Sequence, residues 1–462
     1  MNRPHSRRLL ALAVAVAAWL ALFALLLWIY YQPAVKRLAG DEVMYQHWAQ
    51  ALLAGRHVAV QFIWPPGQAW FLAAIYAVTG VHVLAAQLVQ GALLALCVGL
   101  LWRLWRALDG AAAAAVAAAL FAFNPSIVAN AHWLWPEVPH LACLLAALAL
   151  LQAQGRWPRC RALGAGLLVG LALLFKSLLT GFWPLFLLAF LRRDAPSGPR
   201  GHRWHYRWGA ALLFLAGLAA ATGPSMVHGY RHTGRPLIAN SSIFNLYLGL
   251  TDVDHTDYRT RRAGGVLAEY LHSGDSLAAR EHAFRVKIAG YLAAHGAGEV
   301  VADQLGKQYF RLFNTRTLLL SQFPGRACEG HLGAYAPSPW LGPLDGYARA
   351  MHLLTLVLAA FGIAAFRRWR RPLALFVIAF FGYQLALYAG LHVMQRYLLP
   401  MLPFLCGFAG SFAVAAVARL RGQDVAALSL DRWRLLAGAA LAALLLVLAL
   451  VGPLLDSHCM AG

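Results

Sequence analysis

Long apolar stretches follow one another along this chain of 462 residues. A helix needs about 20 consecutive apolar residues to cross the hydrocarbon core of a bilayer. A broken stretch at 162–191 is expected to form two short spans; the other stretches lie at 9–31, 82–102, 111–130, 136–153, 208–228, 348–366, 372–391, 397–418 and 435–455. The pattern predicts an all-α polytopic membrane protein with about eleven transmembrane helices.

Basic residues concentrate in alternate connections between these spans. Arginines precede the first span, follow the second and the fourth, and recur before 208–228 and after 348–366 and 397–418. Because cytoplasmic loops carry the excess of Lys and Arg, the N-terminus is predicted to be cytoplasmic and the C-terminus extracytoplasmic. We expect a multi-pass protein of a bacterial inner (plasma) membrane. The first apolar stretch lacks a small-residue cleavage site and is predicted to be a retained anchor.

Two long segments, 32–81 and 229–347, face the extracytoplasmic side in this topology. The first is predicted to contain an amphipathic helix over 41–54, followed by Pro65-Pro66 and a short apolar stretch. In the second, Ser276 and Gly296 are expected to bound one helix, and 298–313 to form another. We expect 1–462 to be a single transmembrane domain.

Composition agrees with the membrane class, because 61% of the residues are hydrophobic and only 12% are charged. The net charge of +21 follows from the predicted cytoplasmic connections and gives no support to a nucleic-acid partner. No Walker A sequence, GxGxxG or GxSxG is present, so no nucleotide site is visible. Asp252-Val253-Asp254 has the spacing of a metal–nucleotide motif, but we interpret it as a solvated turn.

Acidic residues at the starts of two predicted helices are the candidate catalytic groups. Asp41 and Glu42 open the helix in the first outer segment, and Glu137 opens the span at 136–153. An acidic pair at a helix start is more often a cap than a catalyst. A carboxylate at the membrane surface can also act as a general base. His132 and His140 flank Glu137, but nothing else completes a coordination shell, so no metal is indicated.

Two cations interrupt the apolar pattern. Lys176 lies inside the apolar stretch at 162–191, and Arg396 lies at the outer start of a span, against the positive-inside trend. One interpretation is that these side chains reach toward lipid headgroups. The interpretation we favour is that they bind the phosphate or pyrophosphate of a lipid, because a guanidinium presents a fork of donors to such a group.

The order of motifs resembles the GT-C fold of glycosyltransferases that use lipid-linked sugars. The likeness is greatest to bacterial relatives of protein O-mannosyltransferases and of the aminoarabinose transferase ArnT. It covers nearly the whole chain and rests on these motifs: Gly40-Asp41-Glu42-Val43-Met44-Tyr45, Trp64-Pro65-Pro66-Gly67, Asn124-Pro125, Pro136-Glu137, Leu174-Phe175-Lys176, Phe244-Asn245-Leu246-Tyr247-Leu248-Gly249 and Arg396-Tyr397-Leu398-Leu399-Pro400.

The resemblance implies a sugar donor on a polyprenyl phosphate and an acceptor outside the cytoplasm, which would be an envelope glycolipid, a glycan or a protein. Asp41 would be the base of an inverting displacement, with Glu42 or Glu137 assisting. Lys176 and Arg396 would stabilise the departing phosphate. No cofactor is implied with certainty. Candidate substrate-binding residues lie in or beside the motifs: Tyr45, Asn245, His392 and Tyr397.

Two other functions remain open at this point. A multi-span transporter would also carry broken helices with charged residues, although no internal repeat is visible. A polysaccharide polymerase or ligase shares the lipid donor and a large outer loop, but would use basic loop residues such as Arg231, Arg235 and Arg259 in place of Asp41. Sequence leaves the sugar, the acceptor and the oligomeric state undetermined.

Cys328 and Cys459 are the cysteines predicted to lie on the extracytoplasmic side, where oxidation is permitted. We predict a disulfide between them, which would tie the large outer segment to the C-terminal tail. Mass mapping of the protein under non-reducing conditions should find the two peptides linked. Detection of both thiols in the free form would reject the pairing.

Overall fold

The computed structural model describes residues 3–30, 38, 40–56, 62–153, 158–188, 200–252, 260–315, 339–423 and 428–455. Within these ranges every regular element is a helix, apart from an isolated bridge between Phe366 and Leu428. The predicted all-α class is therefore confirmed. Cys328 and Cys459, and with them the predicted disulfide, lie outside the described residues.

Seven helices among the described residues are long and apolar enough to cross a membrane. Each overlaps a stretch predicted from the sequence. They are α1 (Arg3–Tyr30), α4 (Val83–Asp109), α10 (Arg200–Thr233), α16 (Leu341–Ala365), α17 (Pro372–Gly390), α18 (Leu402–Leu420) and α19 (Arg432–Leu450).

The other predicted spans are broken or short. α5 (Ala111–Ala122) bends by 59° into Pro125–His132, which comprises α6 (Pro125–Ala129) and η1 (Asn130–His132), and this pair is an eighth candidate span. α7 (Glu137–Gln152) has 16 residues. α8 (Pro158–Phe175) stops before η2 (Ser177–Leu179) and η3 (Trp183–Leu187), at the break that the sequence predicted. Length and composition thus support seven or eight spans, and the total of about eleven stays a prediction.

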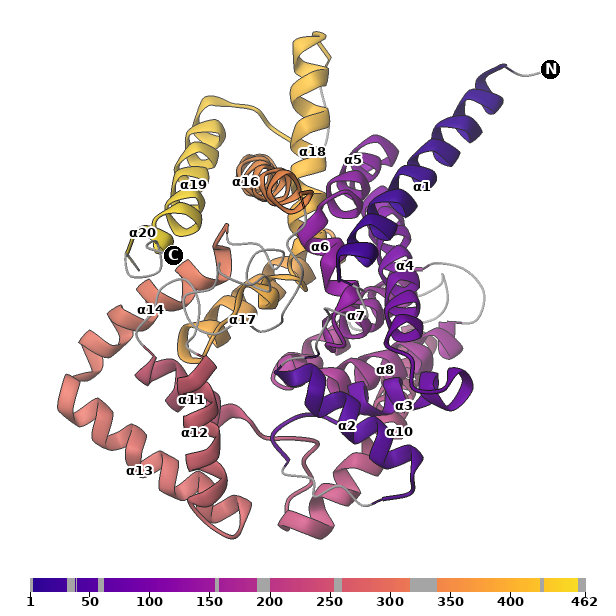
Figure 1. Cartoon of the computed structure of the whole chain (residues 1–462). Coiled ribbons are helices and arrows are strands. Elements are labelled where there is room, and N and C mark those ends of the chain that lie inside the picture. Colours follow the sequence, from indigo (N-terminus) through magenta and orange to yellow (C-terminus); the bar gives the residue numbers. More distant parts are fainter. Residues whose placement is uncertain are drawn as a thin grey trace.

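Shorter helices gather at one end of the bundle (Figure 1). α2 (Asp41–Leu53) packs on α3 (Gly67–Thr79), which in turn contacts α8. α11 (Ser242–Thr251), α12 (Thr260–His272), α13 (Leu277–His295) and α14 (Ala297–Phe313) form a second group. The predicted caps of α13 are confirmed, because the Ser276 hydroxyl accepts from the Ala279 N–H at 3.2 Å and Gly296 ends the helix at φ 76°. α20 (Gly452–Leu455) is the last described helix.

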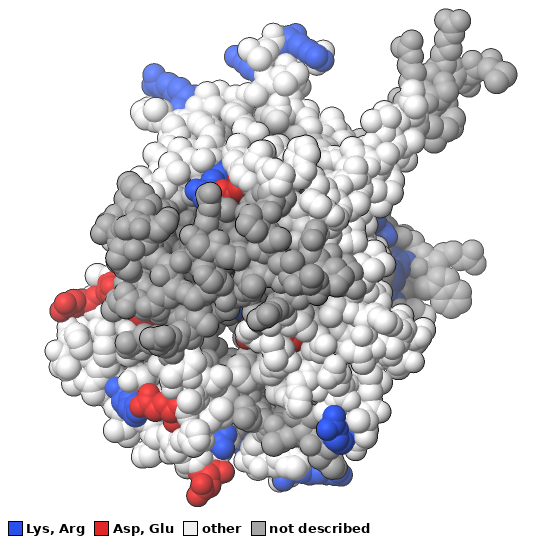
Figure 2. All heavy atoms as spheres, viewed as in Figure 1, with Lys and Arg blue, Asp and Glu red and all other residues white. Residues whose placement is uncertain are grey.

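Charge is distributed unevenly over the face shown in Figure 2. Side chains of Lys and Arg, drawn in blue, stand at the upper end of this face, which is the end where α18 finishes in Figure 1. Both signs of charge appear at the opposite end, where α12 and α13 lie. This distribution agrees with a cytoplasmic end at α18 and an outer end at the short helices, which remains the predicted topology.

α8 and α10 pack with their backbones in close approach. A Cβ at Gly166 would lie 1.9 Å from the Phe214 carbonyl oxygen, and one at Gly217 would lie 2.1 Å from the Leu163 carbonyl oxygen. Small residues at such a crossing are the usual means by which membrane helices approach one another. The pair matters for function because α8 ends at Phe175, directly before Lys176.

Gly217→Ala should therefore destabilise the protein by about 1–3 kcal/mol, because the added methyl overpacks a rigid backbone contact. Gly209→Ala is the matched control on the same helix, since a Cβ there meets no atom within 4 Å. The thermal midpoint of the purified protein in detergent should fall for Gly217→Ala alone. Equal midpoints for the two variants would contradict the close approach.

Candidate active site

A polar cavity of about 560 Å³ lies where the short helices meet the bundle. Its walls come from α2, the 63–65 segment, the start of α7, the end of α8, the 235–245 segment, α17 and the 391–397 segment. Most of the residues singled out from the sequence line it: Asp41, Tyr45, Glu137, Lys176, Asn245, His392, Arg396 and Tyr397. The structure thus brings together side chains that are far apart in the sequence.

Ion pairs connect the charged residues of this cavity. Arg396 donates from Nη2 to Asp41 Oδ2 at 2.6 Å, and its Nε lies 3.4 Å from Glu137 Oε1. Lys176 Nζ donates to the same Glu137 oxygen at 3.0 Å. The side chains of Glu137 and Arg396 are 2% and 7% exposed, so the pairing is largely shielded from water. Two cations and two carboxylates balance one another.

Aromatic rings complete the surroundings of both cations. The Arg396 guanidinium carbon lies 4.2 Å from the centre of the Trp135 ring, and Lys176 Nζ lies 3.9 Å from that of Tyr397. The Tyr388 hydroxyl donates to the Tyr397 carbonyl oxygen at 3.0 Å. Such cation–π contacts add attraction where water is excluded. Sequence reasoning missed Trp135, although it directly precedes the Pro136-Glu137 motif.

Local backbone features place these side chains. α2 begins after Gly40, whose φ of 57° favours glycine, and so Asp41 occupies the first turn. α8 ends at Phe175, and Lys176 is extended at φ −153° and ψ 125°. Gly67 packs against this end of α8, because a Cβ there would lie 2.5 Å from the Leu174 carbonyl oxygen. The Pro65-Pro66-Gly67 turn thereby supports the segment that carries Lys176.

Glu42 does not line the cavity, in contrast to the expectation that it would act beside Asp41. Its side chain is fully buried, and its Oε1 accepts a hydrogen bond from the Leu134 N–H at 2.9 Å. Adjacent residues of a helix point about 100° apart, so only one of the acidic pair can face the cavity. Tyr45 does face it, and burial, reinforced by Asp41, raises the pKa of Tyr45 well above its usual value.

The histidines beside Glu137 contact backbone. His132 Nδ1 lies 3.2 Å from the Val128 carbonyl oxygen, and His140 Nδ1 lies 2.9 Å from that of Ala172. Across the described part of the chain, no three His, Cys, Asp or Glu side chains are grouped as ligands for a metal ion. The residues around Glu137 therefore do not form a recognisable metal site.

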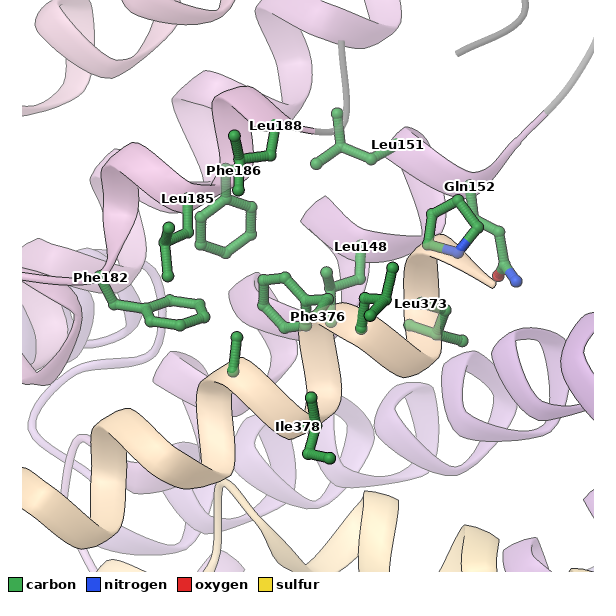
Figure 3. Close-up of a pocket in the computed structure, with 13 residues that line it drawn as sticks. Leu148, Leu151, Gln152, Phe182, Leu185, Phe186, Leu188, Leu373, Phe376 and Ile378 are labelled. Carbon is green, nitrogen blue, oxygen red and sulfur yellow. The ribbon is translucent and has the colours of Figure 1, made fainter. Parts of the chain in front are cut away.

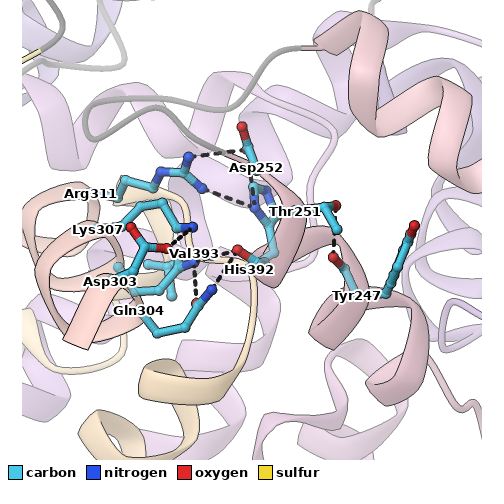
Figure 4. Close-up of polar contacts among 11 residues, drawn as sticks. Tyr247, Thr251, Asp252, Asp303, Gln304, Lys307, Arg311, His392 and Val393 are labelled. Carbon is cyan, nitrogen blue, oxygen red and sulfur yellow. Dashed lines mark hydrogen bonds and ion pairs between the residues drawn. The ribbon is translucent and has the colours of Figure 1, made fainter. Parts of the chain in front are cut away.

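Asp252 is buried and paired, so its interpretation as part of a solvated turn is wrong. Its Oδ2 lies 3.1 Å from Arg311 Nη2, and both side chains are 1% exposed (Figure 4). Arg311 Nη1 also lies 3.4 Å from His392 Nδ1. Burial, reinforced by Arg311, lowers the pKa of His392 well below its usual value. Val253 and Asp254 lie outside the described residues.

Hydrogen bonds join α11 and α14 to the segment that precedes Arg396. The His392 N–H donates to the Asn245 carbonyl oxygen at 3.1 Å, and the Val393 N–H donates to Gln308 Oε1 at 3.0 Å. Gln304 Nε2 donates to the Gly249 carbonyl oxygen at 2.8 Å, which ties α14 to α11 (Figure 4). Residues 235–245 thus form one wall of the cavity, and α11 and α14 fix the chain that carries Arg396.

A second cavity, of about 330 Å³, is apolar. Figure 3 shows Phe182, Phe186 and Phe376 turned toward it, beside Leu148 and Leu373. α17 lines both cavities, because Phe376 and Ala379 face the apolar one and Tyr383 and Leu387 the polar one. Phe182 of the apolar cavity and Tyr383 of the polar cavity are in ring contact, with their ring centroids 5.2 Å apart.

Residues 64–221 match the family model of dolichyl-phosphate-mannose-protein mannosyltransferases. The resemblance to this glycosyltransferase family is confirmed. The matched part contains Glu137 and Lys176 of the cavity, whereas Asp41 and Arg396 lie outside it. No curated protein sequence matches this chain at a significant level.

Solved structures of two kinds are similar to this chain. The archaeal oligosaccharyltransferase AglB from Archaeoglobus fulgidus, in complex with an inhibitory peptide and a dolichol-phosphate, is 12% identical with a TM-score of 0.46. The match covers 96% of this chain and 55% of that one, so this chain spans about half of AglB. ArnT from Cupriavidus metallidurans, bound to undecaprenyl phosphate, is 16% identical with a TM-score of 0.38, over 89% and 79% of the two chains.

Glu137→Gln should lower the thermal midpoint of the protein, because the neutral amide of Gln no longer balances the buried charges of Lys176 and Arg396. Breaking a buried ion pair by removing one partner costs about 3–5 kcal/mol. The double variant Glu137→Gln with Lys176→Met should recover part of the loss, since it also removes one unpaired cation. Glu269→Gln is the control, because it breaks an exposed pair with Lys287 and should cost no more than about 1 kcal/mol. Equal midpoints for Glu137→Gln and Glu269→Gln would contradict the proposed energetics.

Proposed function

We propose that the chain is a membrane glycosyltransferase that moves a sugar from a polyprenyl-phosphate donor to an extracytoplasmic acceptor, with Asp41 as general base. The observation that carries the proposal is the convergence of Asp41, Glu137, Lys176 and Arg396 on one cavity. The family match over 64–221 supports the same reaction class.

The reaction needs a base for the acceptor and cations for the leaving phosphate. An acceptor hydroxyl oxygen forms the new bond to the anomeric carbon while the bond from that carbon to the phosphate oxygen breaks. The bonding pair leaves with the phosphate, and the hydroxyl proton passes to Asp41. Attack from the face opposite the phosphate inverts the anomeric centre. General-base catalysis of this kind contributes about 10²- to 10⁴-fold to the rate.

Lys176 and Arg396 are suited to the phosphate. Arg396 offers a fork of donors and Lys176 a compact charge, and both face the cavity. Charge that develops on the phosphate is stabilised by cations already held in place by Trp135, Tyr397 and Glu137.

The apolar cavity supports a lipid donor. α17 lines both cavities, and Phe182 of the apolar one is in ring contact with Tyr383 of the polar one, so the isoprenoid chain of a phosphate bound beside Arg396 would extend toward Phe182 and Phe376. Apolar side chains of this kind suit a hydrocarbon ligand, whereas a transported polar solute would require a polar path.

The polymerase or ligase alternative depends on loop arginines. Arg235 lines the cavity, but its Nη1 donates to Glu281 Oε2 at 2.8 Å. Arg231 is exposed, and Arg259 lies outside the described residues. Arg235 is therefore the cavity residue through which this alternative can be tested.

The test is mass spectrometry of envelope lipids, glycans and proteins from cells with and without the gene. One sugar modification should depend on the gene. Asp41→Asn should reduce it by about 10²-fold or more, because an amide cannot accept the proton. Glu269→Gln, outside the cavity, should leave it intact. An unchanged modification in Asp41→Asn, or its loss only in Arg235→Gln, would overturn the role of Asp41.

A further inference from the structure

The segment 131–136, which runs from η1 to the start of α7, leads to Pro136 and Glu137 in the lining of the polar cavity. Ala131, Trp133 and Leu134 are fully buried there, and the segment leads into Trp135 and Glu137. Backbone N–H and C=O groups that are buried outside regular structure need partners from side chains, because no ladder or helix supplies them.

Three buried side chains supply these partners. Gln90 Nε2 donates to the carbonyl oxygens of Ala131 at 3.0 Å and Trp133 at 2.5 Å. Gln87 Nε2 donates to the His132 carbonyl oxygen at 3.0 Å, and Glu42 accepts from the Leu134 N–H. Glu42, Gln87 and Gln90 are each 0% exposed. Four consecutive residues are thus held from α2 and α4.

These contacts close a ring with the active-site charges. Glu42 holds Leu134, and the next residue, Trp135, lies under the Arg396 guanidinium. Arg396 pairs with Asp41, which directly precedes Glu42. The contacts therefore form a closed path through five residues, which are Glu42, Leu134, Trp135, Arg396 and Asp41. A shift of the 131–134 backbone would move Trp135, and with it the cation, away from the base.

We propose that Glu42, Gln87 and Gln90 are positioning residues that set the distance between Asp41 and Arg396 through the 131–134 backbone. The inference rests on the proposed function for its catalytic consequence. Glu42 acts as a hydrogen-bond acceptor and transfers no proton in the reaction. The two neighbouring acidic residues thus have different roles. Asp41 faces the substrate, and Glu42 faces the interior of the protein.

The decisive variants are Glu42→Gln and Glu42→Ala. The amide oxygen of Gln still accepts from the Leu134 N–H, so transfer should fall no more than about fivefold. Ala offers no acceptor, and the resulting shift of Trp135 and Arg396 should reduce transfer by about 10- to 100-fold. Affinity for undecaprenyl phosphate in detergent should follow the same order. Asp41→Asn is the comparison, because there the amide cannot accept the proton and transfer should fall by about 10²-fold or more.

The glutamines provide a graded test. Gln90→Met leaves two carbonyl groups unpaired and Gln87→Met leaves one, so the loss of transfer should be larger for Gln90→Met. Glu269→Gln again serves as control. Because both Met variants lose stability, their thermal midpoints are measured beside their kinetics.

A double-mutant cycle distinguishes positioning from general destabilisation. If Glu42 acts through Trp135, the losses of transfer in Glu42→Ala and Trp135→Ala should be less than additive in the double variant. Additive losses, or a Glu42→Gln variant as inactive as Asp41→Asn, would overturn the positioning role. A wild-type protein that neither binds undecaprenyl phosphate nor alters the envelope would overturn the proposed function, and with it this consequence.

Discussion

The need to neutralise buried charge governs this structure. Lys176 and Arg396 are cations in an apolar chain, where an unpaired charge costs several kcal/mol, typically about 3 or more. Glu137 forms ion pairs with both cations, and Asp41 forms a further ion pair with Arg396. Since the four groups come from four separate segments, α2, α7, the end of α8 and η4 (Gln395–Leu398) have to meet at one place. The cavity lies at that meeting point.

Signals that act locally were predictable from the sequence. Ser276 and Gly296 bound α13 because a cap depends on a few neighbouring residues. The end of α8 at Lys176 was equally visible, because a charge interrupts the apolar pattern there. The approximate positions of the spans followed from hydropathy alone. Their number stays a prediction, because α7 has only 16 residues and α8 ends at Phe175 before the short helices η2 and η3.

The orientation of side chains depends on tertiary structure and could not be predicted. In the sequence, nothing distinguishes the neighbouring carboxylates of Asp41 and Glu42. The rotation of α2 about its axis directs Asp41 toward Arg396 and Glu42 toward Leu134. Asp252 resembled a surface turn because its partner, Arg311, comes from another helix. Trp135 had no signal of its own, since its role depends on the guanidinium packed over it.

The ion pair between Arg396 and Asp41 also constrains the order of events under the proposed function. Asp41 and a donor phosphate compete for the same Arg396 donors, because a guanidinium N–H directed at one oxygen is withdrawn from the other. Glu137 and Trp135 keep Arg396 in place when that exchange occurs. Arrival of the donor therefore releases the Asp41 carboxylate at the moment when an acceptor needs a base. Arg396 holds Asp41 until Arg396 binds the phosphate of the donor. Asp41 therefore becomes available as a base only when the donor is present.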